Sequence, residues 1–96
     1  VYLLCLFMPV DAQVEVKNNE GILDMIIYTA QYNWVIEFKF EGQIQKAREC
    51  AEQALVQIHQ KKYYEPLRSE YPNRTILLVG LCVAGRQAKM AYEILK

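Results

Sequence analysis

The sequence predicts an α/β fold: a mixed β-sheet flanked by helices. Three observations support this prediction. Residues 22–28 and 33–40 are rich in β-branched and aromatic side chains and are separated by a short link, as in a β-hairpin. Residues 43–64 carry apolar side chains at helical spacing. Residues 75–83 are almost wholly apolar, as expected of a strand buried on both faces, so the preceding strand and helix lead into a parallel crossover.

The remaining elements follow from local patterns. Residues 14–17 alternate and predict a first strand, which completes a three-strand antiparallel meander with residues 22–28 and 33–40. Pro66 is predicted to stop the helix, and residues 69–74 to form a polar loop. Residues 87–95 alternate weakly and are assigned to an edge strand. The apolar face of the helix is predicted to consist of Ile44, Ala47, Ala51, Ala54, Leu55 and Ile58.

Composition limits the classes of function. The 96 residues predict a single domain, 1–96, and an apolar fraction of 53% argues against disorder. The net charge is zero, so any surface that binds nucleic acid must be local. Cys5, Cys50 and Cys82 are widely spaced without a C-x-x-C pair. They are predicted to be buried free thiols in a reducing, cytoplasmic environment.

Residues 1–10 are apolar but far too few to span a bilayer, which needs about 20 residues. They have no basic stretch before them and no small-residue cleavage site after them, so a signal peptide is not indicated. We interpret them as the last turns of a buried helix that stops near Pro9. This interpretation predicts a fragment that lacks most of its first helix, and an apolar remnant that could support a homodimer.

A pair of carboxylates is the most informative feature. If the hairpin closes around Ala30 and Gln31, Asp24 lies directly opposite Glu37. Opposed side chains have Cβ atoms about 4.5–5.5 Å apart, and like charges there are destabilising. A hard cation such as Mg²⁺ or Mn²⁺ between the two carboxylates would turn that cost into a binding site. We therefore predict that Asp24 and Glu37 are metal ligands.

Lys39 lies two residues beyond Glu37 and projects from the same face of the strand. Such a lysine could orient a hydrolytic water or stabilise charge on a phosphate undergoing cleavage. The plainer alternative is a solvent-facing stripe with a Glu37–Lys39 surface ion pair. For Asp24, which interrupts an apolar strand, the alternative is an aspartate that caps a nearby amide.

The helix adds Gln57 and Lys61, which are four residues apart and share one side. Gln57 could contact a phosphate or a ligand water, and Lys61 a phosphate; the alternative is an ordinary solvated helix border. Tyr63 could stack on a nucleic acid, although a tyrosine that covers the core fits as well. His59 has no metal-binding partner at suitable spacing and is predicted to be a surface residue.

Three segments in order resemble the PD-(D/E)XK nuclease superfamily: residues 21–27 around Asp24, residues 35–40 around Glu37 and Lys39, and residues 54–63 around Gln57. They look closest to the prokaryotic subgroup often found C-terminal to an AAA-ATPase-like domain. The resemblance implies a restriction-endonuclease-like core, with Asp24, Glu37, Lys39 and Gln57 as site residues and Mg²⁺ or Mn²⁺ as cofactor. Ile22 stands where that group usually has an arginine.

Two functions from different classes follow, together with a purely structural alternative. The first is a metal-dependent nuclease that hydrolyses phosphodiester bonds, in DNA by preference. The second is an inactive nuclease-fold module that interacts with or regulates an ATPase domain of the same chain, without membrane contact. In the structural alternative, the hairpin register is shifted by one residue. Such a shift would place the two carboxylates on opposite faces of the sheet.

Overall fold

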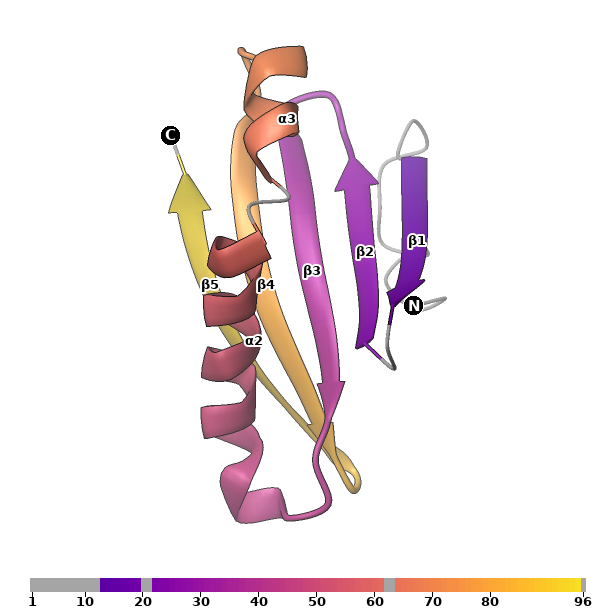
Figure 1. The fold of residues 1–96 in the computed structure, drawn as a ribbon, viewed down its shortest axis with the longest axis vertical. Helices are drawn as coiled ribbons and strands as arrows, with labels where there is room; N and C mark the ends of the chain where they lie inside the picture. Colours follow the sequence, from indigo (N-terminus) through magenta and orange to yellow (C-terminus); the bar gives the residue numbers. More distant parts are fainter. Residues whose placement is uncertain (1–12, 20–21, 62–63, 96) are drawn as a thin grey trace.

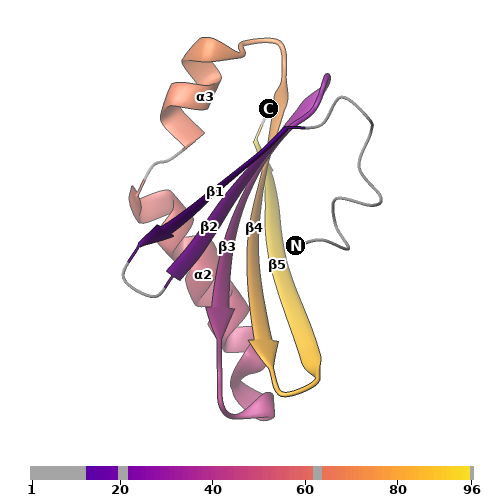
Figure 2. The ribbon, with the colours of Figure 1, turned by 90° about the vertical axis from the view of Figure 1, so that its right-hand side faces the viewer.

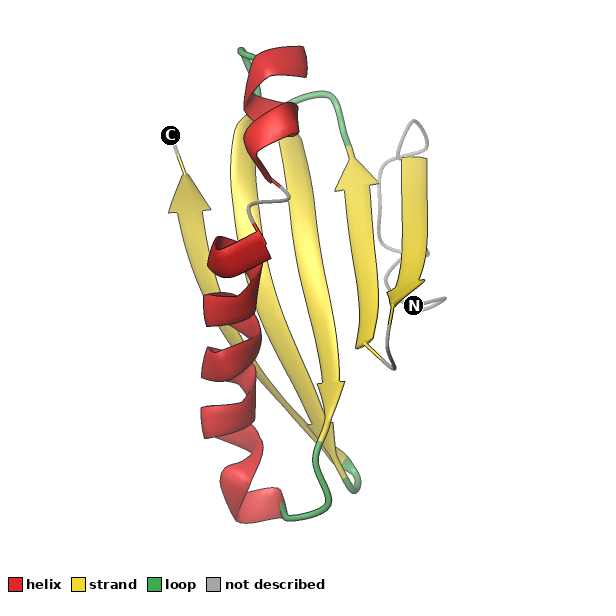
Figure 3. Ribbon diagram, viewed as in Figure 1, coloured by secondary structure: helices red, strands yellow, loops and turns green. Residues whose placement is uncertain are grey.

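The computed structural model describes residues 13–19, 22–61 and 64–95. The predicted helix remnant over residues 1–10, including Cys5, lies outside these described residues, as do Lys62 and Tyr63. Figure 1 shows the described elements in chain order, and Figure 3 separates helices from strands by colour. They are β1 (Gln13–Asn19), β2 (Ile22–Tyr28), β3 (Tyr32–Phe40), a 3₁₀ turn η1 (Ile44–Lys46), α2 (Ala47–Lys61), α3 (Tyr64–Glu70), β4 (Thr75–Ala84) and β5 (Gln87–Leu95).

The strands form one mixed sheet in the order β1-β2-β3-β4-β5. β1, β2 and β3 pair antiparallel, β3 and β4 pair parallel, and β5 returns antiparallel to β4 at the edge. The predicted meander, crossover helix, buried parallel strand and edge strand are all confirmed. The described helices α2 and α3 lie on the same side of the sheet (Figure 2).

The turn between β2 and β3 sets the register of the hairpin. The Thr29 backbone N–H and hydroxyl both donate to the Tyr32 carbonyl oxygen, each at 2.8 Å, and the Tyr32 N–H donates to Thr29 Oγ1 at 3.1 Å. These bonds close the link around Ala30 and Gln31, as predicted. The first strand pair beyond the turn is therefore Tyr28 with Asn33.

Helix α2 approaches the sheet closely because small residues line the contact. Ala51 and Ala54 are buried on the helix, and Gly80 faces them from β4. A Cβ added at Gly80 would lie 2.6 Å from the Leu55 backbone nitrogen and would overlap the Ala51 carbonyl oxygen. Gly80 is also the β4 neighbour of Glu37. The absence of a side chain at Gly80 thus allows the helix backbone to pack directly against the sheet beside Glu37.

The core has one layer on each side of the sheet. Beneath the helices it consists of Ile26, Val35, Ile58, Leu67, Ile76 and Leu78, and a smaller group around the start of α2 adds Ala47, Cys50, Ala51, Cys82 and Ala84. The opposite face carries Met25, Ile27, Ile36, Phe38 and Val79. Because successive strand residues alternate between faces, Asn33, Val35, Glu37 and Lys39 all belong to the helix side.

Three local predictions were wrong. Pro66 does not end a helix: α2 ends at Lys61, and Pro66 lies in the first turn of α3, where its missing N–H is not needed. Helix α3 also extends through Glu70, so the predicted loop begins later. Ile44 is exposed rather than part of the buried helix face, because it belongs to the 3₁₀ turn.

The cysteine prediction was also wrong for two of the three residues. Cys50 on α2 and Cys82 on β4 are paired as a disulfide, with their Cα atoms 5.8 Å apart. They are 32 residues apart in the chain, and only the packing of α2 on β4 brings them together. Linear spacing carries no information about such a contact.

Candidate active site

The two strand carboxylates lie side by side. Asp24 on β2 is directly opposite Glu37 on β3, in the predicted register. The alternative in which they point to opposite faces of the sheet is therefore excluded. Both lie on the face that α2 covers, and only 5% of Asp24 and 1% of Glu37 is exposed to solvent. The alternative of a solvent-facing stripe is wrong as well, since Glu37 is among the most buried side chains of the described chain.

Each carboxylate has an oxygen without a partner among the described residues. Asp24 Oδ1 and Glu37 Oε2 are buried and accept no hydrogen bond, and the same holds for Gln57 Oε1. A buried acceptor without a partner costs about 1–3 kcal/mol, more for a charged group. Carboxylate and amide oxygens are ligands that hard divalent cations prefer. The donor set therefore fits a divalent cation at this position.

The electrostatics of Glu37 point the same way. Burial raises the pKa of the Glu37 carboxyl above its usual range, and the neighbouring Asp24 raises this pKa further, whereas the Lys61 ammonium opposes both effects. The charged form of Glu37 is thus destabilised by its surroundings as they stand. An additional positive charge between the two carboxylates would favour the charged form.

Helix α2 supplies one such charge. Lys61 Nζ donates to Glu37 Oε1 at 3.0 Å, and 27% of the Lys61 side chain is exposed. Gln57 lies one turn earlier on the same side of α2. Lys61 therefore reaches from the helix to a carboxylate of the site. The role predicted for Lys61, a phosphate contact, is not tested by this geometry.

Lys39 lies two residues beyond Glu37, on the same face of β3 and half-buried. It makes no hydrogen bond or ion pair with any described residue, so the Glu37–Lys39 surface pair of the plainer alternative does not form. Its side chain lines a groove of about 300 Å³ at the end of β3, together with Phe40, Glu41, Lys46, Glu49, Cys50 and Gln53. The groove gives the Lys39 side chain access to solvent.

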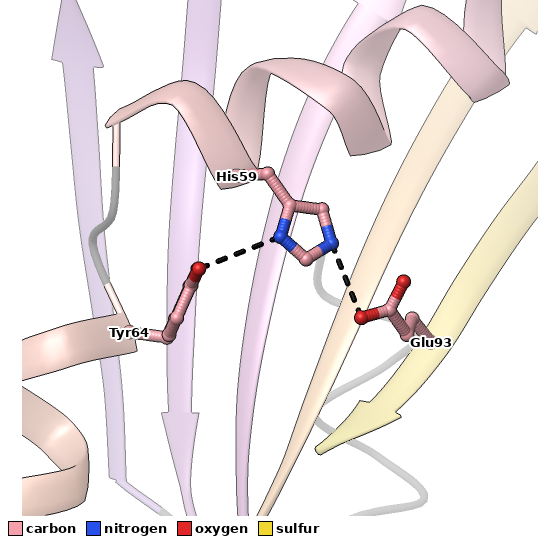
Figure 4. Close-up of polar contacts among 3 residues, drawn as sticks. All are labelled: His59, Tyr64 and Glu93. Atoms are coloured by element: carbon pink, nitrogen blue, oxygen red, sulfur yellow. Dashed lines mark hydrogen bonds and ion pairs between the residues drawn. The ribbon is translucent and has the colours of Figure 1, made fainter.

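His59 has partners that its sequence position did not reveal. Figure 4 shows its ring between Tyr64 at the start of α3 and Glu93 on β5. Nδ1 lies 3.4 Å from the Tyr64 hydroxyl, and Nε2 lies 3.2 Å from Glu93 Oε2. The imidazole is 37% exposed, in agreement with the predicted surface position. This cluster joins the two helices to the sheet edge and does not contact the carboxylate pair.

A comparison with known families decides the relationship. A family model described as the PD-(D/E)XK nuclease superfamily matches residues 1–93, nearly the whole chain. The chain belongs to the PD-(D/E)XK nuclease superfamily. No curated protein and no solved structure matches it. The mixed five-stranded sheet with a parallel β3–β4 pair and a helix packed on it is accordingly a restriction-endonuclease-like α/β fold.

Membership of this superfamily supports a nuclease-type function and an association with nucleic acid. PD-(D/E)XK nucleases generally use divalent metals. Among the described residues, no group of three or more histidine, cysteine, aspartate or glutamate side chains is placed to hold a metal ion. None of the described helices has the length and apolar character needed to cross a membrane.

Proposed function

We propose that the chain is a metal-dependent nuclease domain that hydrolyses the phosphodiester bonds of DNA. The observation that carries the proposal is the opposed Asp24–Glu37 pair, whose oxygens Oδ1 and Oε2 are buried without partners in the described chain. Lys61 offsets only part of the charge of this pair, because it bonds Glu37 Oε1 and leaves both of these oxygens without a donor among the described residues. We infer that the pair is retained for a ligand of opposite charge.

Asp24 and Glu37 would hold Mg²⁺ or Mn²⁺, and the Gln57 amide oxygen, which is also buried without a partner among the described residues, would contact the metal or one of its waters. A bound divalent ion supplies polarisation of the scissile phosphate and a more acidic water. Mg²⁺ usually keeps several waters and takes only one or two protein carboxylates, which agrees with this donor set. The proposal therefore needs no third acidic residue.

The lysines would have separate roles. Lys39 has no partner among the described residues and lines the groove beside the site, so its ammonium can orient a hydrolytic water or stabilise negative charge on the phosphate. Lys61 neutralises Glu37 in the structure as it stands. In the proposed complex with substrate and metal, Lys61 moves from Glu37 to a phosphate oxygen, as its partly exposed position allows.

The second candidate is an inactive nuclease-fold module that serves an ATPase domain of the same full-length chain. Its supporting observations are the zero net charge and Ile22 at the position where related sequences usually carry an arginine. A cytoplasmic location and self-association of the chain belong to the proposal in either form, although the Cys50–Cys82 disulfide removes the free-thiol argument for that location. The two candidates differ in one property, which is metal binding by the carboxylate pair.

Calorimetric titration with Mn²⁺ tests the proposal directly. We expect one site in the wild type, lost in Asp24→Ala and in Glu37→Ala, and retained in Glu52→Gln, which removes one carboxylate from an exposed position on α2. Circular dichroism establishes that each variant is folded. Lys39→Ala should keep the metal but lose cleavage of DNA. A folded wild type that binds no Mn²⁺ would refute the nuclease and favour the interaction module.

A further inference from the structure

A second polar groove lies at the other end of the β2–β3 hairpin. It has a volume of about 410 Å³, within the range of small-ligand sites. Its lining residues come from β1, from the end of β2 and the turn after it, and from the segment between α3 and β4: Gln13, Tyr28, Thr29, Ala30, Tyr71 and Arg74. None of them belongs to the carboxylate site.

Arg74 is held in one orientation by neutral partners. Its Nη1 donates to Asn33 Oδ1 at 3.1 Å, and its guanidinium carbon lies 4.2 Å from the centre of the Tyr71 ring. No carboxylate pairs with Arg74 in the described chain. An arginine presents five N–H donors in a planar fork, and only one of them is used here. The remaining donors are therefore arranged for an acceptor that the described chain does not supply.

Asn33 gives an independent sign of a missing acceptor. Its side chain is fully buried, and its Nδ2 group donates to no described residue. The Asn33 amide lies against the Arg74 guanidinium, which lines the groove. The Asn33 Nδ2 group is buried and Asn33 does not line the groove, so the Arg74 guanidinium is the donor group that a ligand in the groove can reach. An oxyanion or a base carbonyl would satisfy its unused donors.

Beside Arg74 the groove is aromatic, and its β1 side is acidic. The Tyr28 and Tyr71 rings have their centres 5.8 Å apart at an angle of 51°. The Tyr28 hydroxyl donates to Glu15 Oε2 at 3.0 Å, which brings negative charge to the β1 side. A phosphate is repelled from that side and attracted to Arg74. A flat base fits against the tyrosines.

The segment that carries these groups is fixed. The Tyr71 N–H donates to the Leu67 carbonyl at the end of α3, and the Arg74 N–H donates to the Tyr71 carbonyl. The Thr75 N–H donates to the Gln31 carbonyl and so ties the start of β4 to the β2–β3 turn. Both walls of the groove are therefore held by backbone hydrogen bonds. The site is formed before any ligand binds.

We propose that this groove is a subsite for one unpaired nucleotide of a nucleic acid strand, with the phosphate on Arg74 and the base against Tyr28 and Tyr71. The choice of ligand rests on the proposed nuclease function. The Tyr28–Asn33 pair lies four residues along the hairpin from the Asp24–Glu37 pair. This offset is about 13 Å, or roughly four stacked nucleotides at about 3.4 Å each. The subsite would hold the strand at that distance from the bond to be cut.

Fluorescence anisotropy of a labelled oligothymidylate of about 12 nucleotides, long enough at about 3.4 Å per nucleotide to reach both sites, tests the subsite. The titration is made with chelator present, so that it does not depend on metal or cleavage. Arg74→Ala is expected to weaken binding about tenfold and to reduce the salt slope by about 0.7, the value for one phosphate of a single strand.

Tyr28→Leu should also weaken binding about tenfold through lost stacking, whereas Tyr28→Phe, which keeps the ring, should bind as the wild type does. The matched control is Arg86→Ala, which removes the same charge from the turn after β4, at the opposite end of that strand from Arg74. Arg86→Ala should leave the affinity unchanged. Circular dichroism checks the fold of every variant, and Arg74→Lys gives a milder change that keeps the charge.

Equal affinity and equal salt slope for the wild type and Arg74→Ala would overturn the subsite, as would a folded wild type that does not bind the oligonucleotide. Neither result touches metal binding at Asp24 and Glu37, which calorimetry measures separately. Arg74-dependent binding without any metal binding would instead retain the subsite and refute the nuclease. The two proposals can therefore fail independently.

Discussion

Replacing Asp24 by asparagine should affect stability in opposite directions with and without metal. In the wild type, two buried carboxylates face each other across the β2–β3 ladder. Two unit charges about 5 Å apart interact by about 3 kcal/mol at an effective dielectric constant of about 20. Because Lys61 already offsets part of the Glu37 charge, we expect a net gain of about 1–2 kcal/mol in the metal-free variant. The new amide can also donate to Glu37 Oε2, which now lacks a partner among the described residues.

The assay is urea denaturation at neutral pH, first with chelator and then with Mn²⁺. A ligand present at about 100 times its dissociation constant stabilises the folded state by about 2.7 kcal/mol. The wild type should gain about this amount with Mn²⁺, and Asp24→Asn should gain nothing, so the order of stability of the two proteins is reversed. Glu52→Gln, with the same loss of charge at an exposed site, should follow the wild type in both conditions.

The pH dependence has a defined sign. The pKa of Glu37 is raised in the folded state, so the folded protein holds this proton more tightly than the unfolded chain does. The stability of the metal-free wild type therefore falls as pH rises from the ordinary glutamate pKa through the raised value. The advantage of Asp24→Asn needs an ionised Glu37, so it should shrink as pH is lowered. A metal-free Asp24→Asn protein less stable than the wild type at neutral pH would refute this reasoning.

Three further predictions concern the scaffold. Gly80→Ala should destabilise the fold by about 1–3 kcal/mol in urea, since the added Cβ lies 2.6 Å from the Leu55 nitrogen; an unchanged midpoint would contradict this packing. An ultraviolet titration should show a tyrosine with a pKa of about 12, and this transition should be absent in Tyr28→Phe. Because the folded state retains the Tyr28 proton, the stability of the wild type should fall as pH rises from about 10 to 12. Reduction with dithiothreitol should lower the free energy of unfolding by about 3–4 kcal/mol, as expected for the loop closed between Cys50 and Cys82. The same treatment should have no effect on a Cys50→Ala, Cys82→Ala double variant.

The strands and the carboxylate pair could be predicted because they depend on local signals. Period-two patterns and the short link after Tyr28 determine where β2 and β3 run, and a tight turn leaves few registers. The register that closes around Ala30 and Gln31 places Asp24 opposite Glu37, and the structure adopts this register. The close resemblance of the segments around these residues to a known superfamily pointed to the same pair.

Other features could not be derived from the chain alone, because they depend on how distant segments pack. Whether Glu37 faces solvent or α2 follows from which side of the sheet the crossover helix covers, and alternation along β3 does not distinguish the two. The same packing brings Lys61 to Glu37 and Cys50 to Cys82.

Arg74 and Asn33 are 41 residues apart, and no local pattern relates them. The sequence by itself therefore determined the strands and the opposed carboxylates, since hydrophobic period and turn length act over a few residues. Tertiary structure decided their burial, their lysine partner and the second groove, because these require contacts between elements far apart in the chain.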